Sequence, residues 1–311
     1  MFNMNGALVI DKPEGKTSHD VVGSVRHILH ERRIGHTGTL DPFATGVLII
    51  LVGRSTRLAQ FFTDNDKEYE AIVRLGYATT TGDRTGDPLS NPSEITRKWS
   101  EEEIEPALAS LRGNIDQIPP MYSAKKIAGQ KLYELARRGE EVERKPVRVC
   151  IHAFEALRPN GELMKDNEDG TFDFRVRVVC STGTYVRTLA EDFGSRLGVG
   201  AHLAELRRTR VGEFSIDAAV TLAELKSRFA EEALGTVLVP PSAALSHLPF
   251  LHLTDNDARR ARHGMEVEVT NLDWTDGTNV KLCDAQGTLI SVGVYNENKR
   301  QVHPRVVVDT A

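Results

Sequence analysis

The sequence predicts an α+β fold built on a largely antiparallel sheet. Apolar and charged residues alternate from Phe172 to Val178 and again from Glu68 to Leu75, which is the period of a half-buried strand. Helix signals interrupt these strands at irregular intervals, for example the Ser-x-x-Glu capping box of Ser100 and Glu103. A regular alternation of strands and helices would indicate a parallel sheet, so the irregular mixture favours antiparallel pairing.

Three elements are predicted near the N-terminus. Apolar residues at helical spacing from Val21 to Leu29 predict a helix that Ser18 caps. The apolar run from Val47 to Val52 predicts a buried strand. Between them, the segment Gly35–Gly46 is too rich in glycine and threonine to be a helix or a strand, so we expect a loop that exposes Asp41.

The middle of the chain adds helices to the sheet. Apolar residues between Ile104 and Leu111 follow the capping box and predict one helix. A second helix is predicted over Leu132 to Ala136, and Gly139 is its expected C-cap. A third is predicted to begin at Thr221.

A domain boundary is predicted in the proline-rich stretch from Pro240 to Pro249, which gives a first domain over residues 1–245 and a second over 246–311. A helix from Thr254 to His263 opens the second domain. Short strands are then predicted over Glu266–Thr270, Val280–Asp284, Thr288–Tyr295 and Arg305–Val308. A unit of about 60 residues is marginally stable alone, so we expect it to pack against the first domain.

The charge balance argues against a protein that coats nucleic acid indiscriminately. The chain has 39 Lys plus Arg against 44 Asp plus Glu, a net charge of −5. Basic residues are nevertheless concentrated between Met121 and Cys150, with eight Lys or Arg against four Glu, and a second group comprises Arg207, Arg208 and Arg210. Each group predicts either an RNA-binding patch or a solvated surface.

The cysteines and the hydropathy pattern predict a protein of the reducing cytoplasm. Cys150, Cys180 and Cys283 are odd in number and far apart, which indicates neither a disulfide framework nor a zinc site. No segment approaches the 18 or so continuous apolar residues that a membrane helix needs.

The loop around Asp41 carries the strongest functional signal. An Asp before a proline is a common turn former, so on local grounds a structural turn is an equal alternative. The whole string Gly35–Gly46, with His36 five residues before Asp41, resembles the catalytic motif of the TruB-type tRNA pseudouridine synthases. Further segments are similar to that family in the same order along the chain, over residues 6 to 215: Asp11–Ser18, Lys67–Gly76, Ile118–Ala124, Cys180–Leu189 and Gly200–Gly212.

The resemblance implies a pseudouridine synthase fold with a mixed, largely antiparallel sheet. It also implies an RNA-gripping insertion at about residues 120–146 and a C-terminal PUA-like RNA-binding barrel. The implied activity is isomerisation of the T-loop uridine at position 55 of tRNA. This reaction transfers no group and no electron, so it needs neither a cofactor nor a metal.

The resemblance also assigns roles to particular residues. Asp41 is the implied catalytic carboxylate, Arg187 the cation that keeps it ionised, and Tyr69 a residue that stacks on the base and can move a proton. The remaining expected substrate contacts are His36, Tyr185 and Leu206. Expected contacts to the RNA backbone are Lys16, Lys125, Lys126, Lys131, Arg137 and Arg138. Lys12 and Pro13 are expected to brace the Asp41 loop.

The expected partner is therefore the T-arm of tRNA, bound by a cytoplasmic monomer with no obligatory protein partner. A guide-RNA-dependent pseudouridine synthase fits the same motifs, because that branch of the superfamily uses the same catalytic core. The sequence is also compatible with a non-catalytic protein that binds or folds tRNA and, less closely, with a hydrolase of small substrates. A P-loop enzyme is excluded, since Gly53–Thr56 lacks the upstream glycine and the lysine.

Overall fold

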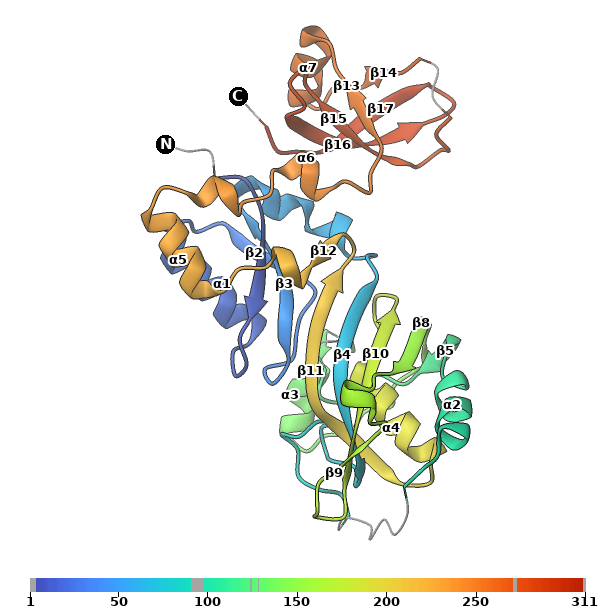
Figure 1. Cartoon of the computed structure of the whole chain (residues 1–311). Helices are drawn as coiled ribbons and strands as arrows, with labels where there is room; N and C mark the ends of the chain where they lie inside the picture. The colour runs from blue at the N-terminus through green and yellow to red at the C-terminus, as the bar shows by residue number, and fades with distance from the viewer. Residues whose placement is uncertain (1–3, 91–97, 124, 128, 271–272, 310–311) are drawn as a thin grey trace.

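One large sheet forms the body of the molecule (Figure 1). The computed structural model describes residues 4–90, 98–123, 125–127, 129–270 and 273–309. The main strands lie in the order β1 (Gly6–Lys12), β3 (Thr45–Val52), β11 (Gly200–Val211), β4 (Lys67–Gly76), β10 (Phe172–Cys180), β8 (Val147–Ala156) and β5 (Gly113–Gln117). Strands β2 (Ile34–Thr37), β9 (Lys165–Asp166) and β12 (Phe214–Ser215) pair at its margins. Every pairing is antiparallel except that of β11 with β3, which confirms the predicted fold class.

Helices pack on the sheet because the strands present buried apolar side chains on the faces that the helices cover. In the half of the sheet that contains β4 and β10, Phe174 of β10 stacks on Phe193 of helix α4 (Val186–Arg196), with ring centroids 5.2 Å apart. Helix α2 (Glu101–Ala109), with the predicted capping box of Ser100 and Glu103, lies next to α4. Helices α1 (Ser18–Leu29) and α5 (Leu222–Ala230) pack together near β1.

The N-terminal elements follow the prediction with two corrections. Thr17, not Ser18, caps α1, because Thr17 and Asp20 form the reciprocal capping box. The buried Ser18 hydroxyl instead hydrogen-bonds both backbone groups of Leu40. The predicted loop over Gly35–Gly46 begins later than expected, because its first residues form β2, which pairs with β3.

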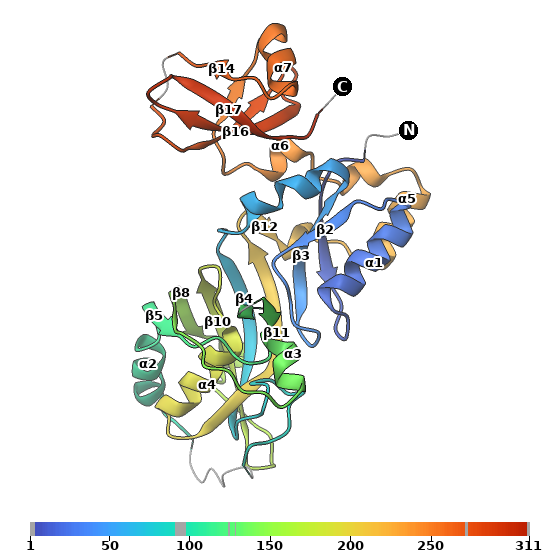
Figure 2. The same cartoon turned by 180° about the vertical axis from the view of Figure 1, so that it is seen from behind.

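A second sheet forms the C-terminal part (Figures 1 and 2). Its strands lie in the order β13 (Phe250–His252), β15 (Asn279–Cys283), β16 (Leu289–Asn296), β17 (Gln301–Val307) and β14 (Val267–Glu268). Helix α7 (Asp255–Arg262) confirms the helix predicted from Thr254 to His263, and these two residues are its caps. The prediction missed β13, which pairs with β15 in parallel, whereas the remaining strands match it within a few residues. This small sheet agrees with the predicted PUA-like barrel.

The two sheets share an apolar core, as expected for a small C-terminal unit. Val9 of β1 and Ile49 of β3 belong to one buried cluster with Leu245, Val292 and Val306. Helix α6 (Pro241–Ala244) lies at this junction (Figure 1). The exact boundary at residue 245 stays our proposal. No helix in the described part of the chain is long and apolar enough to cross a membrane.

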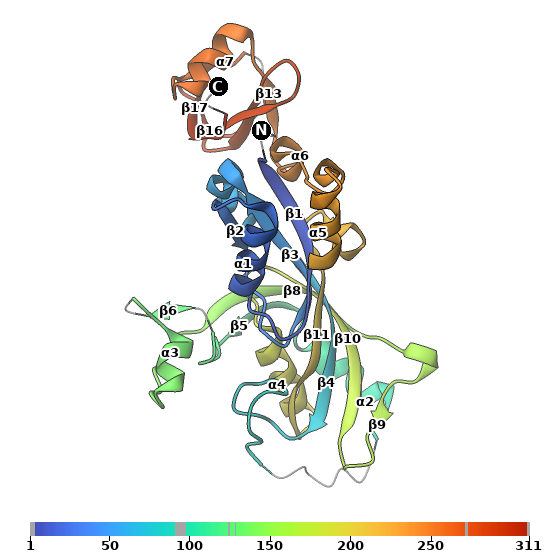
Figure 3. The same ribbon diagram turned by 90° about the vertical axis from the view of Figure 1, so that its left-hand side faces the viewer.

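The predicted insertion stands apart from the sheet, beside the end of α1 (Figure 3). It contains β6 (Lys126–Ile127), β7 (Gln130–Lys131) and α3 (Leu132–Arg137), and Gly139 ends α3 with φ of +74° as predicted. The side chains of Lys126 and Lys131 lie outside the described residues. Short 3₁₀ segments complete the chain: η1 (Gly53–Phe62), η2 (Pro159–Gly161), η3 (Ile216–Ala218) and η4 (Leu234–Thr236).

Candidate active site

The loop that carries Asp41 joins β2 to β3 and is held by buried polar side chains. Lys12 is fully buried, and its ammonium group donates to the carbonyl oxygens of Pro13 (3.0 Å), Lys16 (2.6 Å) and Pro42 (3.2 Å). Ser18 holds the backbone of Leu40, one residue before Asp41. The predicted bracing role of Lys12 therefore has a direct geometric basis.

The structure brings Asp41 and Arg187 together. Nε of Arg187 lies 3.0 Å from Oδ2 of Asp41, and Nη2 donates to Oδ1 over 3.3 Å. The guanidinium also donates to the carbonyl oxygens of Thr81 and Tyr122, each at 2.7 Å. The Arg187 side chain is only 5% exposed, whereas Asp41 keeps 35% of its side-chain surface open toward the adjacent cavities.

Asp83 completes this charge cluster and was not predicted from the sequence. Its carboxylate lies 3.8 Å from Nη1 of Arg187 and accepts hydrogen bonds from Thr81 Oγ1 (2.9 Å), Thr85 N (2.9 Å) and Thr85 Oγ1 (2.5 Å). These bonds fix Asp83 within a tight turn. The dense run of Thr, Gly and Asp from Thr79 to Asp87 was the available signal, because such residues form ordered turns.

The charges around Asp41 act in opposite directions on its protonation. Burial raises the pKa of the Asp41 carboxyl, and the Asp83 carboxylate raises it further. The Arg187 guanidinium and the more distant Lys12 lower the pKa of Asp41, but the net direction remains upward. Arg187 is therefore the main group that favours the ionised form of Asp41 in this setting.

A pocket opens beside Asp41 and Arg187 toward strands β4 and β11. This cavity of about 330 Å³ is lined by Tyr69, Tyr185, Leu206 and Arg208, together with Lys67. Tyr69 and Leu206 are buried, at 8% and 7% exposure, and supply its aromatic and apolar surface. A carboxylate, a cation and an aromatic ring therefore border one small space.

Several details of the pocket wall were not assigned from the sequence. The Gln117 amide on β5 fixes the backbone of Tyr185 at both its N–H (2.7 Å) and its C=O (3.0 Å). Burial lowers the pKa of Lys67, whose ammonium donates to the Thr63 carbonyl over 3.1 Å. Burial raises the pKa of the Tyr69 phenol, and the positive charge of Arg208 partly offsets that effect.

A second cavity of about 730 Å³ borders the same charge cluster. It shares Asp41 and Arg187 with the first pocket and extends toward the N-terminus of α1 and toward Tyr133 and Arg137 of α3. The guanidinium of Arg137 lies 5.6 Å from the centre of the Tyr133 ring. Asp41 therefore borders both a small pocket and a wider cavity beside the insertion.

His36 does not line either of these cavities. It lies on β2, where its ring meets that of His19 edge-on at 5.2 Å. Burial, His19 and Arg208 lower the pKa of His36, so the imidazole is neutral near pH 7. The expected contact of His36 with substrate stays a prediction.

The residues expected to contact the RNA backbone lie in different surroundings. Lys16 is exposed at the turn before α1, and Lys125 is half-buried. Arg138 is exposed and pairs with Glu140 at 2.9 Å. In the described part of the chain, no group of three or more His, Cys, Asp or Glu is arranged to hold a metal ion.

The second predicted basic group, Arg207, Arg208 and Arg210, is only partly at the surface, because the side chains of Arg207 and Arg210 are 41% and 37% exposed whereas Arg208 is buried. Arg208 is 1% exposed and makes its hydrogen bonds inside the protein. Arg207 pairs with Asp11 at 2.8 Å, and Arg210 pairs with Glu68 at 3.1 Å. The charges of Arg207 and Arg210 are therefore paired with carboxylates, and Arg208 lies inside the protein.

Comparison with known proteins agrees with the family resemblance of the sequence motifs over most of the chain. Residues 26–186 match the model described as TruB family pseudouridylate synthase (N terminal domain), and residues 187–246 match that of the tRNA pseudouridylate synthase B C-terminal domain. The chain is 46% identical to tRNA pseudouridine synthase B of Bacillus pumilus over 84% of this chain and 82% of that protein. It is 42% identical to the protein of that name from Solibacter usitatus, over 98% and 100%.

Solved structures of similar fold match this chain over almost its whole length. A chain of the crystal structure of a Cbf5-Nop10-Gar1 complex superposes with a TM-score of 0.74 at 26% identity, covering 98% of this chain and 85% of that one. A chain in a structure of an H/ACA RNP bound to a substrate RNA superposes with a TM-score of 0.72 at 25% identity, with the same coverage. Both matches include the C-terminal sheet, because they cover almost all of this chain. The chain belongs to the TruB family of pseudouridylate synthases.

Proposed function

We propose that this protein is a tRNA pseudouridine synthase that isomerises the T-loop uridine at position 55 to pseudouridine. The single observation that carries the proposal is the Asp41 carboxylate, paired with Arg187 at 3.0 Å beside a pocket lined by Tyr69 and Leu206. Relatives that share 42–46% identity with this chain are named tRNA pseudouridine synthase B, which supports tRNA as the substrate.

The chemistry requires the uridine to leave its stack before it reacts. Flipping a base costs a few kcal/mol, and stacking on an aromatic ring returns about 1–3 kcal/mol. Tyr69 and Tyr185 offer such rings inside the pocket, and Leu206 offers an apolar surface. We therefore place the flipped uridine between these three side chains, with Asp41 next to its sugar and base.

Asp41 then acts on the flipped nucleotide as an ionised carboxylate. The bond between C1′ of the ribose and N1 of the base breaks, and a bond between C1′ and C5 forms. The proton that leaves C5 is balanced by a proton that N1 takes up, so the product is an isomer of the substrate. Arg187 favours the ionised form of this carboxylate.

RNA outside the pocket is proposed to lie in the wider cavity between α1 and the insertion. Arg137 lines this cavity, and Lys16 lies exposed at the turn before α1. Contacts of Lys16, Lys125, Arg137 and Arg138 to phosphates would give orientation and salt dependence rather than base identity. We further propose that the enzyme acts on cytoplasmic tRNA as a monomer without a protein partner.

A guide-RNA-dependent activity has weaker support. The chain is 26% identical to the protein in the Cbf5-Nop10-Gar1 complex, against 46% to the Bacillus pumilus enzyme. A protein that only binds or folds tRNA would have no use for the Asp41–Arg187–Asp83 cluster, since binding alone does not need a paired carboxylate in a pocket.

Release of tritium from a tRNA transcript labelled at C5 of uracil tests the proposal. We expect release with the wild-type protein, and none with Asp41→Asn or with a transcript that carries cytidine at position 55. Asp116→Asn is the matched control, because Asp116 is exposed on the edge strand β5. Tight tRNA binding without tritium release by the wild type would instead identify a binding protein.

A further inference from the structure

Arg208 has an unusual position for an arginine, because it is one of the largest fully buried side chains of the protein. Nε donates to the Val47 carbonyl over 2.7 Å, and Nη2 donates to the Gly38 carbonyl over 3.0 Å. Nη1 lies 3.5 Å from the carbonyl oxygen of Thr39. These carbonyls belong to the two ends of the loop that carries Asp41.

The backbone of Arg208 holds the same loop a second time. Gly46 pairs with Arg208 where β3 runs parallel to β11. The approach is so close that a Cβ atom at Gly46 would lie 2.2 Å from the Arg208 carbonyl oxygen, and Gly46 has φ of +101°. Both ends of the Asp41 loop therefore rest on one residue.

Arg208 also lies beside Tyr69, the second proposed catalytic side chain of the pocket. Arg208 of β11 lies opposite Tyr69 of β4, and both residues line the pocket beside Asp41. The residue that holds the Asp41 loop is therefore also a neighbour of Tyr69.

The charge of Arg208 is not neutralised by a carboxylate. In the described residues no Asp or Glu oxygen forms a salt bridge with it, and its acceptors are neutral oxygens. Burial lowers the pKa of Lys12, Lys67 and His36, and the charge of Arg208 lowers each of them further. A buried, unpaired cation is costly, so a role for its charge accounts for its presence better than packing alone.

We propose that Arg208 is a positioning residue for the isomerisation: it holds the two backbone segments on either side of Asp41 against β11, and so sets the position of the Asp41 carboxylate relative to Tyr69 in the pocket. This inference rests on the proposed function.

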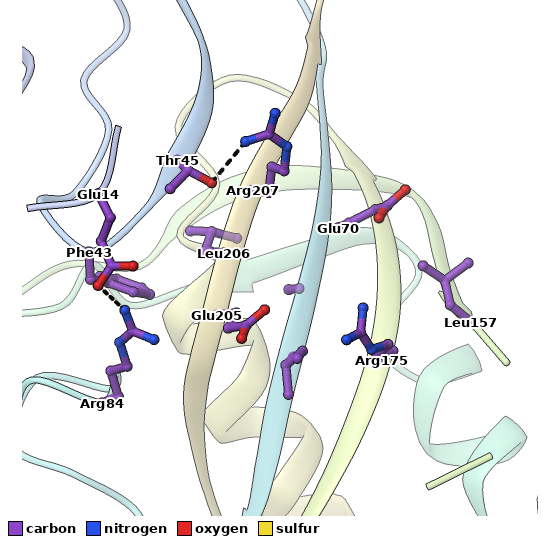
Figure 4. A pocket seen from close by; sticks show the side chains of 12 residues that line it. Glu14, Phe43, Thr45, Glu70, Arg84, Leu157, Arg175, Glu205, Leu206 and Arg207 are labelled. Atoms are coloured by element: carbon purple, nitrogen blue, oxygen red, sulfur yellow. Dashed lines mark hydrogen bonds and ion pairs between the residues drawn. The ribbon is translucent and has the colours of Figure 1, made fainter. Parts of the chain in front are cut away.

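The strand itself supplies a matched control. Arg207 is the preceding residue and points to the opposite face of β11, into a charged groove with Glu70, Arg175 and Glu205 (Figure 4). It pairs there with Asp11 and donates to Thr45 over 3.3 Å. Arg207→Gln therefore removes an arginine from the same strand without touching the pocket.

The experiment compares Arg208→Gln, Arg208→Lys and Arg207→Gln with the wild type. We measure kcat and KM on the tRNA transcript, together with thermal unfolding. We expect Arg208→Gln to lower kcat by about 100-fold with little change in KM, as when a reacting group is misplaced by about 1 Å. We also expect Arg208→Lys to restore part of kcat.

The outcomes separate the role in catalysis from a role in folding. A folded Arg208→Gln variant with wild-type kcat, or with a loss of kcat that Arg207→Gln shares, would overturn the proposal. If Arg208→Gln does not fold, Arg208→Lys decides, and a wild-type kcat in that variant would refute the proposal. Absence of turnover by the wild type would instead contradict the proposed function.

Discussion

Arg187→Met should move the pH dependence of activity to higher pH. Asp41 must be ionised to act, so activity falls as pH falls through its pKa, which burial already raises. Two unit charges at about 4 Å interact by about 4 kcal/mol at an effective dielectric constant of about 20, which corresponds to about 3 pKa units. Asp41 keeps 35% of its side-chain surface exposed, and solvent screening reduces this effect to about 1–2 units.

The assay is kcat/KM for tritium release between about pH 5 and 9, with circular dichroism at each pH. We expect the acid limb of Arg187→Met to lie about 1–2 pH units above that of the wild type, with part of the activity recovered at high pH. Arg196→Met is the control, because Arg196 is exposed in the last turn of the same helix. An acid limb at the wild-type pH in a folded Arg187→Met variant would refute the reasoning.

Three further predictions concern stability and thiol reactivity. Gly46→Ala should lower the free energy of unfolding by at least about 3 kcal/mol because of atomic overlap and backbone strain. Gly23→Ala, on the open face of α1, should raise the free energy of unfolding by about 0.5–1 kcal/mol. Urea titration measures both, and equal effects would contradict the steric account. The full chain should unfold in one calorimetric transition, since Leu245 belongs to a core that both sheets share, and two separated transitions would show independent units. Iodoacetamide at pH 8 should label Cys150 much faster than Cys180, because Cys180 is buried and its pKa is raised to about 11. Mass spectrometry of the native and the denatured protein measures the labelling, and equal rates in the native state would contradict this prediction.

Elements with a long, regular pattern were predictable from the sequence, and those fixed by distant contacts were not. The strand from Phe172 and the helix from Thr221 follow local periodicity and capping, and both occur as predicted. Thr17 and Ser18 are equally good cap formers, and only the tertiary contact of Ser18 with Leu40 separates their roles. Strand β13 has three residues and pairs in parallel, so no local signal marks it.

The functional site likewise contains residues that the sequence motifs identified and residues that only distant contacts bring into place. Motif resemblance pointed to Asp41 and Arg187, which the structure brings together. Asp83 enters only through a turn that folds back onto Arg187, which lies far away along the chain. The arginine run was misinterpreted because the pairing register of β11 shifts between Arg208 and Arg210, which breaks the alternation that would reveal which side chain faces inward.

Strand β3, which follows the Asp41 loop directly, is buried on both of its faces. Every residue from Gly46 to Val52 is buried, because one core lies on each face of this strand. Amide hydrogens in such a strand exchange with solvent mainly when the whole molecule unfolds. Heat should therefore abolish activity and native structure at the same temperature, with no intermediate range in which a folded protein has lost its site. The small C-terminal sheet, far from the reacting uridine, thus helps to set the temperature limit of catalysis.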